Sequence, residues 1–391
     1  MNGTTYKRTK GNWAYSLYLG RTDDGRQRRV YASGFATKRE ADDARRAKIL
    51  EIADQAAVQE GAPATLGQLL KIFLETAATR CSPKTLERYK NLAEYIHPDV
   101  LATSLSEVNT LQLEREFERL RQSGGHHRRT KEARPLSGRT VRHVWGIVSA
   151  ALNNGIRLGF MRMNPATNCH LPPIERREKA TLDPTGTDFL LAALKGTALH
   201  ALVLIAAATG ARRGELLALT WSDVDQARGL LTISKSLEQT RAGLRIKSTK
   251  TERPRLVRLP ALACEALEGH RKAQREHQAA FGEDYLTDPH FIFAAGDGSA
   301  LKPDTVTATL CRIAKEVGLE GISLHSLRHS HGSQLLSAGV PLPAVSKRLG
   351  HSSPRITAEI YSHALPHDEE AAAGVWDALM RPHLDTPKKT Q

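Results

Sequence analysis

The apolar and polar positions of the first 50 residues follow the pattern of a small sheet and one helix. Residues 13–19 alternate between apolar and polar side chains and are rich in aromatics, which is typical of a strand, and residues 28–31 return as a second strand. The stretch Thr-Asp-Asp-Gly at 22–25 predicts the turn between them. Thr37 and Glu40 form a capping box, which predicts that a helix follows.

Helical spacing dominates the next hundred residues. Apolar side chains recur at helical period over residues 66–74, and Ser82 followed by Pro83 predicts the N-terminus of a second helix. A third helix is predicted over residues 111–120, and Ser137 caps a fourth. Gly, Pro and charged residues gather on either side of this all-helical stretch and predict linkers at residues 59–63 and 171–179.

From residue 180 onward, short predicted strands lie among helices. The predicted elements are a helix over 200–208, strands over 230–236, 244–246 and 255–259, helices over 261–277 and 304–317, three short helices between 324 and 361, and a last helix over 368–379. We therefore expect a multidomain α+β protein. Its expected parts are a small β-sheet-plus-helix N-terminal domain (1–57), an all-helical domain (64–170) and a mainly α domain with a small antiparallel β-sheet (180–381).

The composition favours a polyanionic partner. The 391 residues include 56 Lys and Arg against 42 Asp and Glu, which gives a formal net charge of +14. Residues 1–48 hold twelve basic and five acidic residues, so half of the net charge lies in the predicted N-terminal domain. Net charge alone does not distinguish DNA, RNA and an acidic membrane.

Cysteine spacing and apolar runs argue against several classes of protein. The four cysteines are far apart and form no C-x-x-C pair, which argues against a zinc site and a disulfide framework. The longest apolar run, residues 201–208, is much shorter than the ~20 residues that span a bilayer. The first residues lack the apolar core of a signal peptide. We expect a cytoplasmic protein with no membrane segment.

The densest chemistry lies in one C-terminal stretch. His325 and Arg328 are three residues apart, so a helix would present both on one face. Gly350 suits a helix C-terminus and is followed directly by His351. Tyr361 lies ten residues beyond that histidine. Any one of these residues alone is more often a surface or core side chain, but together they can bind, protonate or attack a phosphate.

The order H-x-x-R, then L-G-H-S, then a tyrosine resembles the tyrosine recombinase (phage integrase) family. Two earlier motifs extend the resemblance, because Arg212 in TGARRGEL matches the family's first arginine motif and Lys250 in STKT matches its hairpin lysine. Arg213 and Lys247 compete for these two roles on residue type alone, and the register of the family selects Arg212 and Lys250. The resemblance covers residues 180–364 and, more loosely, the helical segment before them.

The resemblance implies cleavage of DNA through a 3′-phosphotyrosyl bond that leaves a free 5′-hydroxyl. Tyr361 is then the nucleophile, and its proton must be removed because the unperturbed phenol has a pKa of about 10. His325 is the expected base. Lys250 is the expected acid, because the leaving 5′-oxygen would otherwise depart as a poor alkoxide.

The arginines are expected to stabilise charge in the transition state. Arg212 and Arg328 would face the non-bridging oxygens of the phosphate, with His351 as a further donor and Glu215 orienting a guanidinium. The motifs contain no carboxylate cluster suited to Mg²⁺ and no Gly-rich loop that ends in GK[ST]. We therefore expect covalent catalysis by protein groups, with no metal and no cofactor.

The same resemblance implies an integrase of a phage or another mobile element, encoded by a bacterium or phage and associated with the nucleoid. Its parts would be an arm-type DNA-binding domain, a core-binding domain and a catalytic domain. Its expected partners are double-stranded attachment sites, three further copies in a tetramer that passes through a Holliday junction, and possible directionality and DNA-bending proteins. The alternatives are a type IB topoisomerase and a DNA-binding regulator with a retired active site.

Overall fold

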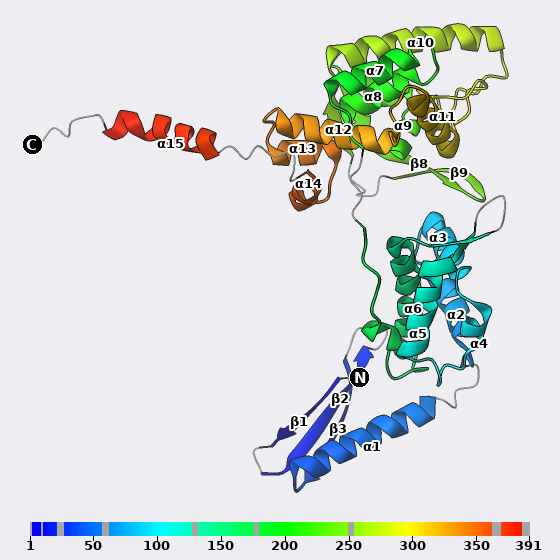
Figure 1. Cartoon of the computed structure of the whole chain (residues 1–391), viewed down its shortest axis with the longest axis vertical. Helices are drawn as coiled ribbons and strands as arrows, with labels where there is room; N and C mark the ends of the chain where they lie inside the picture. The colour runs from blue at the N-terminus through cyan, green and yellow to red at the C-terminus, as the bar shows by residue number, and fades with distance from the viewer. Residues whose placement is uncertain are drawn as a thin grey trace, which may run out of the picture. The chain divides into compact units, whose positions relative to one another are not determined.

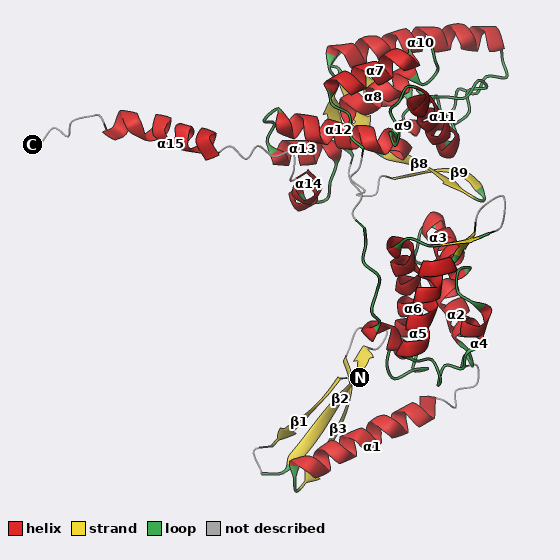
Figure 2. Cartoon of the chain, in the orientation of Figure 1, coloured by secondary structure: helices red, strands yellow, loops and turns green. Residues whose placement is uncertain are grey.

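The chain is a mixed α+β protein that divides into two compact units, Met1–Arg177 and Glu178–Gln391. The computed structural model describes residues 2–8, 11–21, 27–56, 62–126, 132–175, 180–248, 254–361 and 369–384 (Figure 1). Helices make up most of both units, and the strands form small sheets (Figure 2). The predicted fold class is confirmed, and the division into three domains stays a prediction.

The N-terminal sheet has three antiparallel strands, of which the sequence patterns predicted two. They pair in the order β1 (Asn2–Lys7), β2 (Trp13–Arg21) and β3 (Gln27–Phe35). Helix α1 (Lys38–Ala56) packs against the sheet, and Leu17 and Ala41 are fully buried. The opposite, open face carries the alternate residues of each strand, of which Tyr6 and Tyr31 are exposed whereas Ala14 and Ser16 are buried.

The start of α1 has the expected capping box. The Glu40 N–H donates to Thr37 Oγ1 at 3.2 Å, and the Thr37 N–H donates to Glu40 Oε2 at 3.3 Å. These reciprocal bonds satisfy amides that have no partner inside the helix. The predicted turn at residues 22–25 lies outside the described residues.

The helical part of the first unit has its own core. Its elements are α2 (Leu66–Ala78), α3 (Pro83–Ala93), α4 (Pro98–Ala102), α5 (Thr110–Ser123), the pair β4 (Gly125–His126) and β5 (Ala133–Arg134), α6 (Gly138–Arg157) and the 3-10 turn η1 (Pro165–Asn168). Ser82 and Ser137 accept from backbone N–H groups as N-caps, as their sequence positions indicated. Leu69, Leu120 and Val144 are completely buried in this core.

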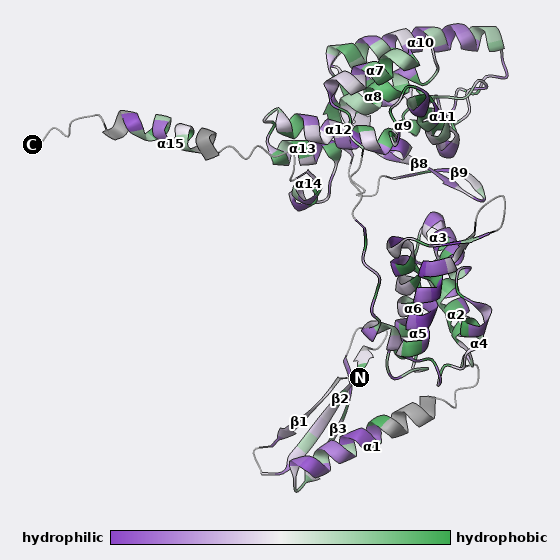
Figure 3. Cartoon of the chain, viewed as in Figure 1, coloured by the Kyte–Doolittle hydropathy of each residue, from purple (hydrophilic) through white to green (hydrophobic). Residues whose placement is uncertain are grey.

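The second unit is organised around α8 (His200–Thr209), a helix buried on nearly every side. Figure 3 shows its apolar character. Around it lie α7 (Pro184–Leu194), α9 (Arg213–Leu217), the 3-10 turn η2 (Trp221–Asp223), α10 (Ala261–Phe281), α11 (Pro303–Glu316) and α12 (Leu324–Ser337). A helix that is apolar on all sides is most stable at the centre of a core, because little of its apolar surface is then exposed to water. α8 contacts α7, α9, α10 and α12, which places the motif-bearing α12 directly against it.

Two small antiparallel sheets complete this unit. One has the order β10 (Arg255–Arg258), β7 (Leu230–Ile233), β6 (Val224–Asp225), and the other is the hairpin of β8 (Lys235–Thr240) and β9 (Gly243–Ser248). The strand predicted over residues 230–236 is therefore two strands, divided at Ser234. Each half pairs with a different partner.

The three predicted short helices are α12, α13 (Leu342–Leu349) and α14 (Pro354–Tyr361), and the last predicted helix is α15 (Glu369–Leu384). Gly350 ends α13 in the left-handed conformation with φ 68°, which glycine adopts without steric cost. Across the described residues, no helix combines the length and apolar character needed to cross a membrane.

Candidate active site

Arg212 is positioned by the junction between α8 and α9. α8 ends at Gly210, whose φ of 64° turns the chain, and Arg212 follows as the N-cap of α9 with an extended backbone. A Cβ at Gly210 would lie 2.8 Å from the ring of His331, so close packing as well as backbone conformation requires glycine here. The backbone N–H and the guanidinium of Arg212 both donate to Glu215, at 2.9 and 2.8 Å.

Glu215 holds two arginines at once. It is 2% exposed and also accepts from the guanidinium of Arg255 at 3.2 and 2.6 Å. Burial acts to raise the pKa of Glu215, but the hydrogen bonds and charge of Arg255 and then of Arg212 outweigh burial and lower the pKa to about 2. The carboxylate is therefore ionised at neutral pH. Arg213 instead donates to Asp304 on α11 at 3.3 Å.

Arg328 reaches the same place from α12. It is 3% exposed, and its two terminal nitrogens donate to the backbone oxygens of Gly210 and Leu349, both at 2.7 Å. Burial, followed by the charge of Arg212, lowers the pKa of Arg328 to about 10, so the group stays charged at neutral pH. Arg212 donates to the adjacent oxygen of Gly350 at 3.2 Å. The two guanidiniums thus meet at the C-terminal end of α13.

His351 follows that helix end directly and is half-buried. Its Nδ1 lies 2.7 Å from the hydroxyl of Thr357, a fully buried residue of α14. Burial, then the charges of Arg328 and Arg212, lowers the pKa of His351 to about 4, so the imidazole is neutral at pH 7. When the Thr357 hydroxyl donates to Nδ1, the Nε2–H remains as a donor for another group.

Tyr361 is 1% exposed. Its hydroxyl donates to the backbone oxygen of Arg328 at 3.4 Å, and its ring stacks on that of His351 with centroids 6.5 Å apart. A Cβ at Gly332 on α12 would lie 2.6 to 2.9 Å from the Tyr361 ring and hydroxyl, so the absence of a side chain there makes room for the phenol. Burial raises the pKa of Tyr361 against the opposing charges of Arg328 and Arg212.

His325 differs from Arg212, Arg328, His351 and Tyr361 because it is exposed. Its Nε2 lies 3.1 Å from Nε2 of His329, and the two rings meet edge to face. The ring of His329 in turn lies 5.7 Å from that of Tyr361. His329, which the sequence motif did not single out, therefore stands between the expected base and the expected nucleophile.

Lys250 lies outside the described residues. Lys247, its competitor in the sequence, forms an ion pair across the β8–β9 hairpin with Glu238, whose side chain is 9% exposed. An ammonium held by a nearly buried carboxylate is occupied by that partner.

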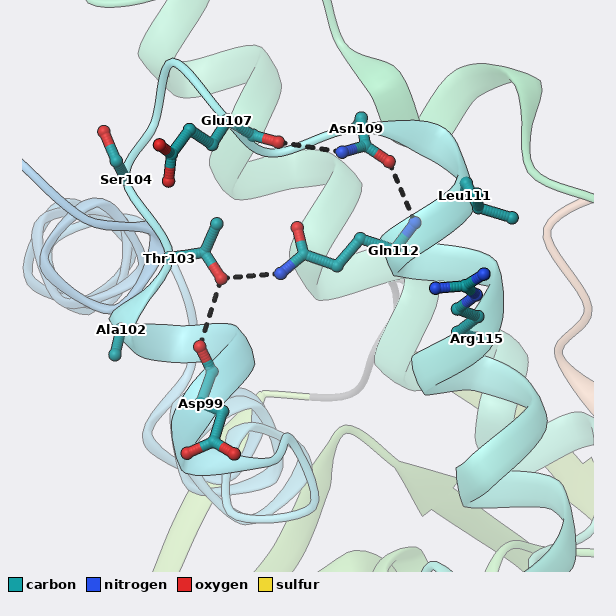
Figure 4. Close-up of a pocket in the computed structure, with 9 residues that line it drawn as sticks. All are labelled: Asp99, Ala102, Thr103, Ser104, Glu107, Asn109, Leu111, Gln112 and Arg115. Atoms are coloured by element: carbon teal, nitrogen blue, oxygen red, sulfur yellow. Dashed lines mark hydrogen bonds between the residues drawn. The ribbon is translucent and has the colours of Figure 1, made fainter.

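A groove lies in the helical part of the first unit. This polar groove of about 710 Å³ runs along the α4–α5 connection (Figure 4). Thr103 occupies its middle, where it accepts from Gln112 at 2.6 Å and donates to the Asp99 backbone at 3.1 Å. None of the residues singled out from the sequence lines it.

Comparison with protein families identifies the chain. Residues 182–367 match the phage integrase family, and residues 4–52 match an arm DNA-binding domain. The chain therefore carries a phage integrase family domain, and its relatives are tyrosine recombinases and integrases. A XerC-like tyrosine recombinase of Caldanaerobacter subterraneus subsp. tengcongensis is 28% identical over 94% of this chain and 96% of its own length. The ICEBs1 integrase of Bacillus subtilis is 26% identical over 63% of this chain and 67% of its own.

Solved structures share the fold of this recombinase. The Tn1549 transposon integrase in complex with a circular intermediate DNA superimposes with a TM-score of 0.66 at 19% identity, covering 80% of this chain and 99% of that one. A lambda integrase tetramer bound to a Holliday junction superimposes with a TM-score of 0.56 at 19% identity, covering 91% and 94%. The recombinase is thus an enzyme of site-specific recombination, and the topoisomerase and regulator alternatives are not favoured.

Proposed function

We propose that this recombinase integrates and excises a mobile element by breaking and rejoining DNA strands through a 3′-phosphotyrosyl bond to Tyr361. The observation that carries the proposal is the meeting of Arg212 and Arg328 at the end of α13, with His351 and Tyr361 beside them. The ICEBs1 relative is named as an integrase, and the Tn1549 structure holds transposon circle DNA. Both support a mobile element as the substrate.

The arginine cluster suits a phosphodiester. Three positive charges meet at this site, on Arg212, Arg255 and Arg328. The carboxylate of Glu215 is hydrogen-bonded to the first two and lies near the third. A bound phosphate would supply negative charge, and that charge grows on the non-bridging oxygens in the transition state. Guanidinium donors that are already in place stabilise this developing negative charge without having to move.

The proton of Tyr361 needs an acceptor at the moment of attack. Because burial raises the pKa of the phenol, the hydroxyl is protonated at neutral pH. We assign the base to His325, acting on the tyrosine side where His329 adjoins both rings. We assign His351 as a neutral donor to the phosphate through Nε2, with Thr357 holding the other ring nitrogen.

Lys250 is proposed as the acid that protonates the leaving 5′-oxygen. Its assignment rests on the sequence motif. The competing residue, Lys247, is a poorer candidate because its ammonium is paired with Glu238. General acid catalysis of this kind typically contributes ~10²–10⁴-fold.

The N-terminal sheet is proposed to bind arm-type DNA with its open face. Pairing across the strands puts Tyr6, Tyr31 and Arg29 on that face. Tyr6 is 42% exposed and Tyr31 is 61% exposed. The Arg29 guanidinium lies 5.9 Å from the centre of the Tyr18 ring. Exposed aromatics interleaved with basic side chains suit a nucleic acid, and a small sheet fits the major groove. The helical segment 64–170 is proposed as the core-binding domain.

The proposed assembly is a homotetramer on double-stranded attachment sites. Lambda integrase, of the same fold, has been solved as a tetramer bound to a Holliday junction, which supports two rounds of strand exchange through such a junction. A directionality factor and a DNA-bending protein are further proposed partners. The proposed place of action is the bacterial cytoplasm, where nucleoid DNA is accessible.

Covalent trapping tests the proposed chemistry. Wild-type protein incubated with a nicked suicide duplex of the attachment site should give a shifted band on a denaturing gel, and Tyr361→Phe should bind the DNA without that band. Tyr285→Phe is the matched control, because Tyr285 is another buried tyrosine of the same unit and only accepts a hydrogen bond from Gln274, at 3.1 Å. An adduct with Tyr361→Phe, or none with wild type, would refute the assignment.

Deletion of residues 1–57 tests the arm-binding role. The shortened protein should still cleave a core site but integrate poorly, and the salt dependence of its binding to full attachment DNA should be flatter because fewer phosphates are neutralised. At finer scale, Arg29→Ala should weaken arm binding. Arg46→Ala, an exposed arginine of α1, should not. An unchanged salt slope after the deletion would exclude the arm-binding role.

A further inference from the structure

Arg255 is an arginine of the site that has no place in the sequence motifs. It is the first residue of β10, and its side chain is 9% exposed. Its two terminal nitrogens both donate to Glu215, and its Nε donates to the backbone oxygen of Arg348 at 3.1 Å. A guanidinium that is engaged on both edges and almost fully covered is poorly placed to contact DNA.

The partner of its Nε belongs to a wider arrangement at the end of α13. The three successive backbone oxygens of residues 348, 349 and 350 accept from three different arginines, which are Arg255, Arg328 and Arg212 in that order. The last carbonyls of a helix have no partner within it and carry its partial negative charge. The end of α13 is therefore a common anchor for three guanidiniums.

Gly350 provides a second and independent observation. Its φ of 68° already favours glycine, and a Cβ there would lie 2.9 to 3.1 Å from three side-chain atoms of Arg255. The backbone of the L-G-H motif and the Arg255 guanidinium are thus in direct contact. A shift of either one would move the oxygen that holds Arg212.

We propose that Arg255 is a positioning residue for the cleavage reaction: it ties Glu215 to the end of α13, so that Arg212 and Arg328 face the scissile phosphate together. The inference rests on the proposed role of those two arginines. Arg255 joins them by two routes, through the carboxylate that also binds Arg212 and through the carbonyl next to the one that binds Arg328. It does not itself contact substrate.

Removal of Arg255 has a specific electrostatic consequence. Arg255 is the largest of the influences that lower the pKa of Glu215, and they act against burial. In Arg255→Met the carboxylate stays buried, hydrogen-bonded to Arg212 and with the charge of Arg328 nearby, so its pKa should rise. Protonated Glu215 cannot hold the Arg212 guanidinium by charge. Cleavage should then fall as the pH is lowered through the new pKa.

The experiment measures single-turnover cleavage of the nicked suicide duplex by the full-length protein, at saturating DNA, from about pH 5 to pH 8. Arg255→Met should be slower than wild type by ~10–100-fold, by analogy with the loss of a residue that orients a metal ligand. Its rate should also fall more steeply than that of wild type as the pH is lowered. The cleavage rate of Arg255→Lys should lie between those of Arg255→Met and wild type, because one ammonium cannot reach both Glu215 and the Arg348 oxygen.

Two further variants separate positioning from a folding defect. Arg258→Met is the matched control, since Arg258 is an exposed arginine of the same strand, and it should cleave like wild type. In Arg255→Met/Glu215→Gln this additional fall should disappear, because the titrating carboxylate is gone. An Arg255→Met rate within twofold of wild type, or a uniform loss with the same pH dependence as wild type, overturns the inference. Absence of adduct with wild type would instead overturn the proposed function.

Discussion

Acidification should weaken the packing of α12 against α8 and α13, because His331 is buried in its neutral form. His331 is 8% exposed, and its Nε2 accepts from Arg348 Nε at 3.0 Å. Burial first, and then the charge of Arg348, lowers the pKa of His331 to about 4, against the opposing effect of its bond to the Ala207 backbone. A proton on Nε2 would face the N–H of a guanidinium.

The sign and size of the effect follow from linkage. The unfolded chain binds this proton near the ordinary pKa of 6.5 and the folded chain only near 4, so the stabilisation is complete above pH 6.5 and is lost as the pH falls towards 4. A difference of about 2.5 pKa units corresponds to about 3 kcal/mol. Between these limits the free energy of unfolding should fall by up to about 1.4 kcal/mol per pH unit from this residue alone.

The assay is urea unfolding of the second unit from pH 7 to pH 4.5, followed by the fluorescence of Trp221 with Trp13, Trp145 and Trp376 replaced by Phe. The variant is His331→Gln, which cannot titrate and keeps an acceptor for Arg348. Its stability at pH 7 should be lower, but its slope against pH should be shallower than that of the parent. Parallel slopes would refute the assignment of a buried, neutral His331.

Three further outcomes are expected. Lys250→Ala should cleave an ordinary duplex ~10²–10⁴-fold more slowly but approach the wild-type rate when the leaving 5′-oxygen is replaced by sulfur, which needs no proton to depart; equal defects on both substrates would move the acid elsewhere. Gly332→Ala should cost about 1–3 kcal/mol of stability through its clash with Tyr361, and a cost that persists in a Tyr361→Ala background would exclude that clash. Thr357→Val should slow cleavage about tenfold without weakening DNA binding, because His351 loses the partner of its Nδ1; an unchanged cleavage rate would contradict this role.

Local signals predicted much of the fold. The capping residues Thr37, Ser82 and Ser137 act within a few residues of themselves, so the helices they start were correctly predicted. β1 was missed because its residues, NGTTYK, are mostly polar and show no apolar alternation. β1 is a strand because it pairs with β2, and its own sequence carries no strand pattern. The division of the predicted 230–236 strand at Ser234 likewise depends on distant partner strands.

Only those residues of the candidate site that belong to a sequence motif could be predicted from the sequence. The resemblance to the family's motifs assigns Arg212, Arg328, His351 and Tyr361, and the structure brings these four residues together. Arg255 contacts Glu215 from 40 residues away and the Arg348 backbone from 93 residues away. No local pattern encodes such contacts. A basic residue at the start of a predicted strand is also common on protein surfaces.

The charges around Tyr361 constrain the order of events in cleavage. Before DNA binds, the phenol is buried and donates to the Arg328 backbone, and the guanidiniums of Arg328 and Arg212 only partly offset the effect of burial on its pKa. An entering phosphate pairs with those same guanidiniums and weakens their pull on a developing phenolate. DNA binding therefore does not create a free tyrosinate in advance. In the proposed mechanism, removal of the proton therefore accompanies the attack. His329, whose ring lies 5.7 Å from that of Tyr361, and its neighbour His325 then contribute to the geometry of that step.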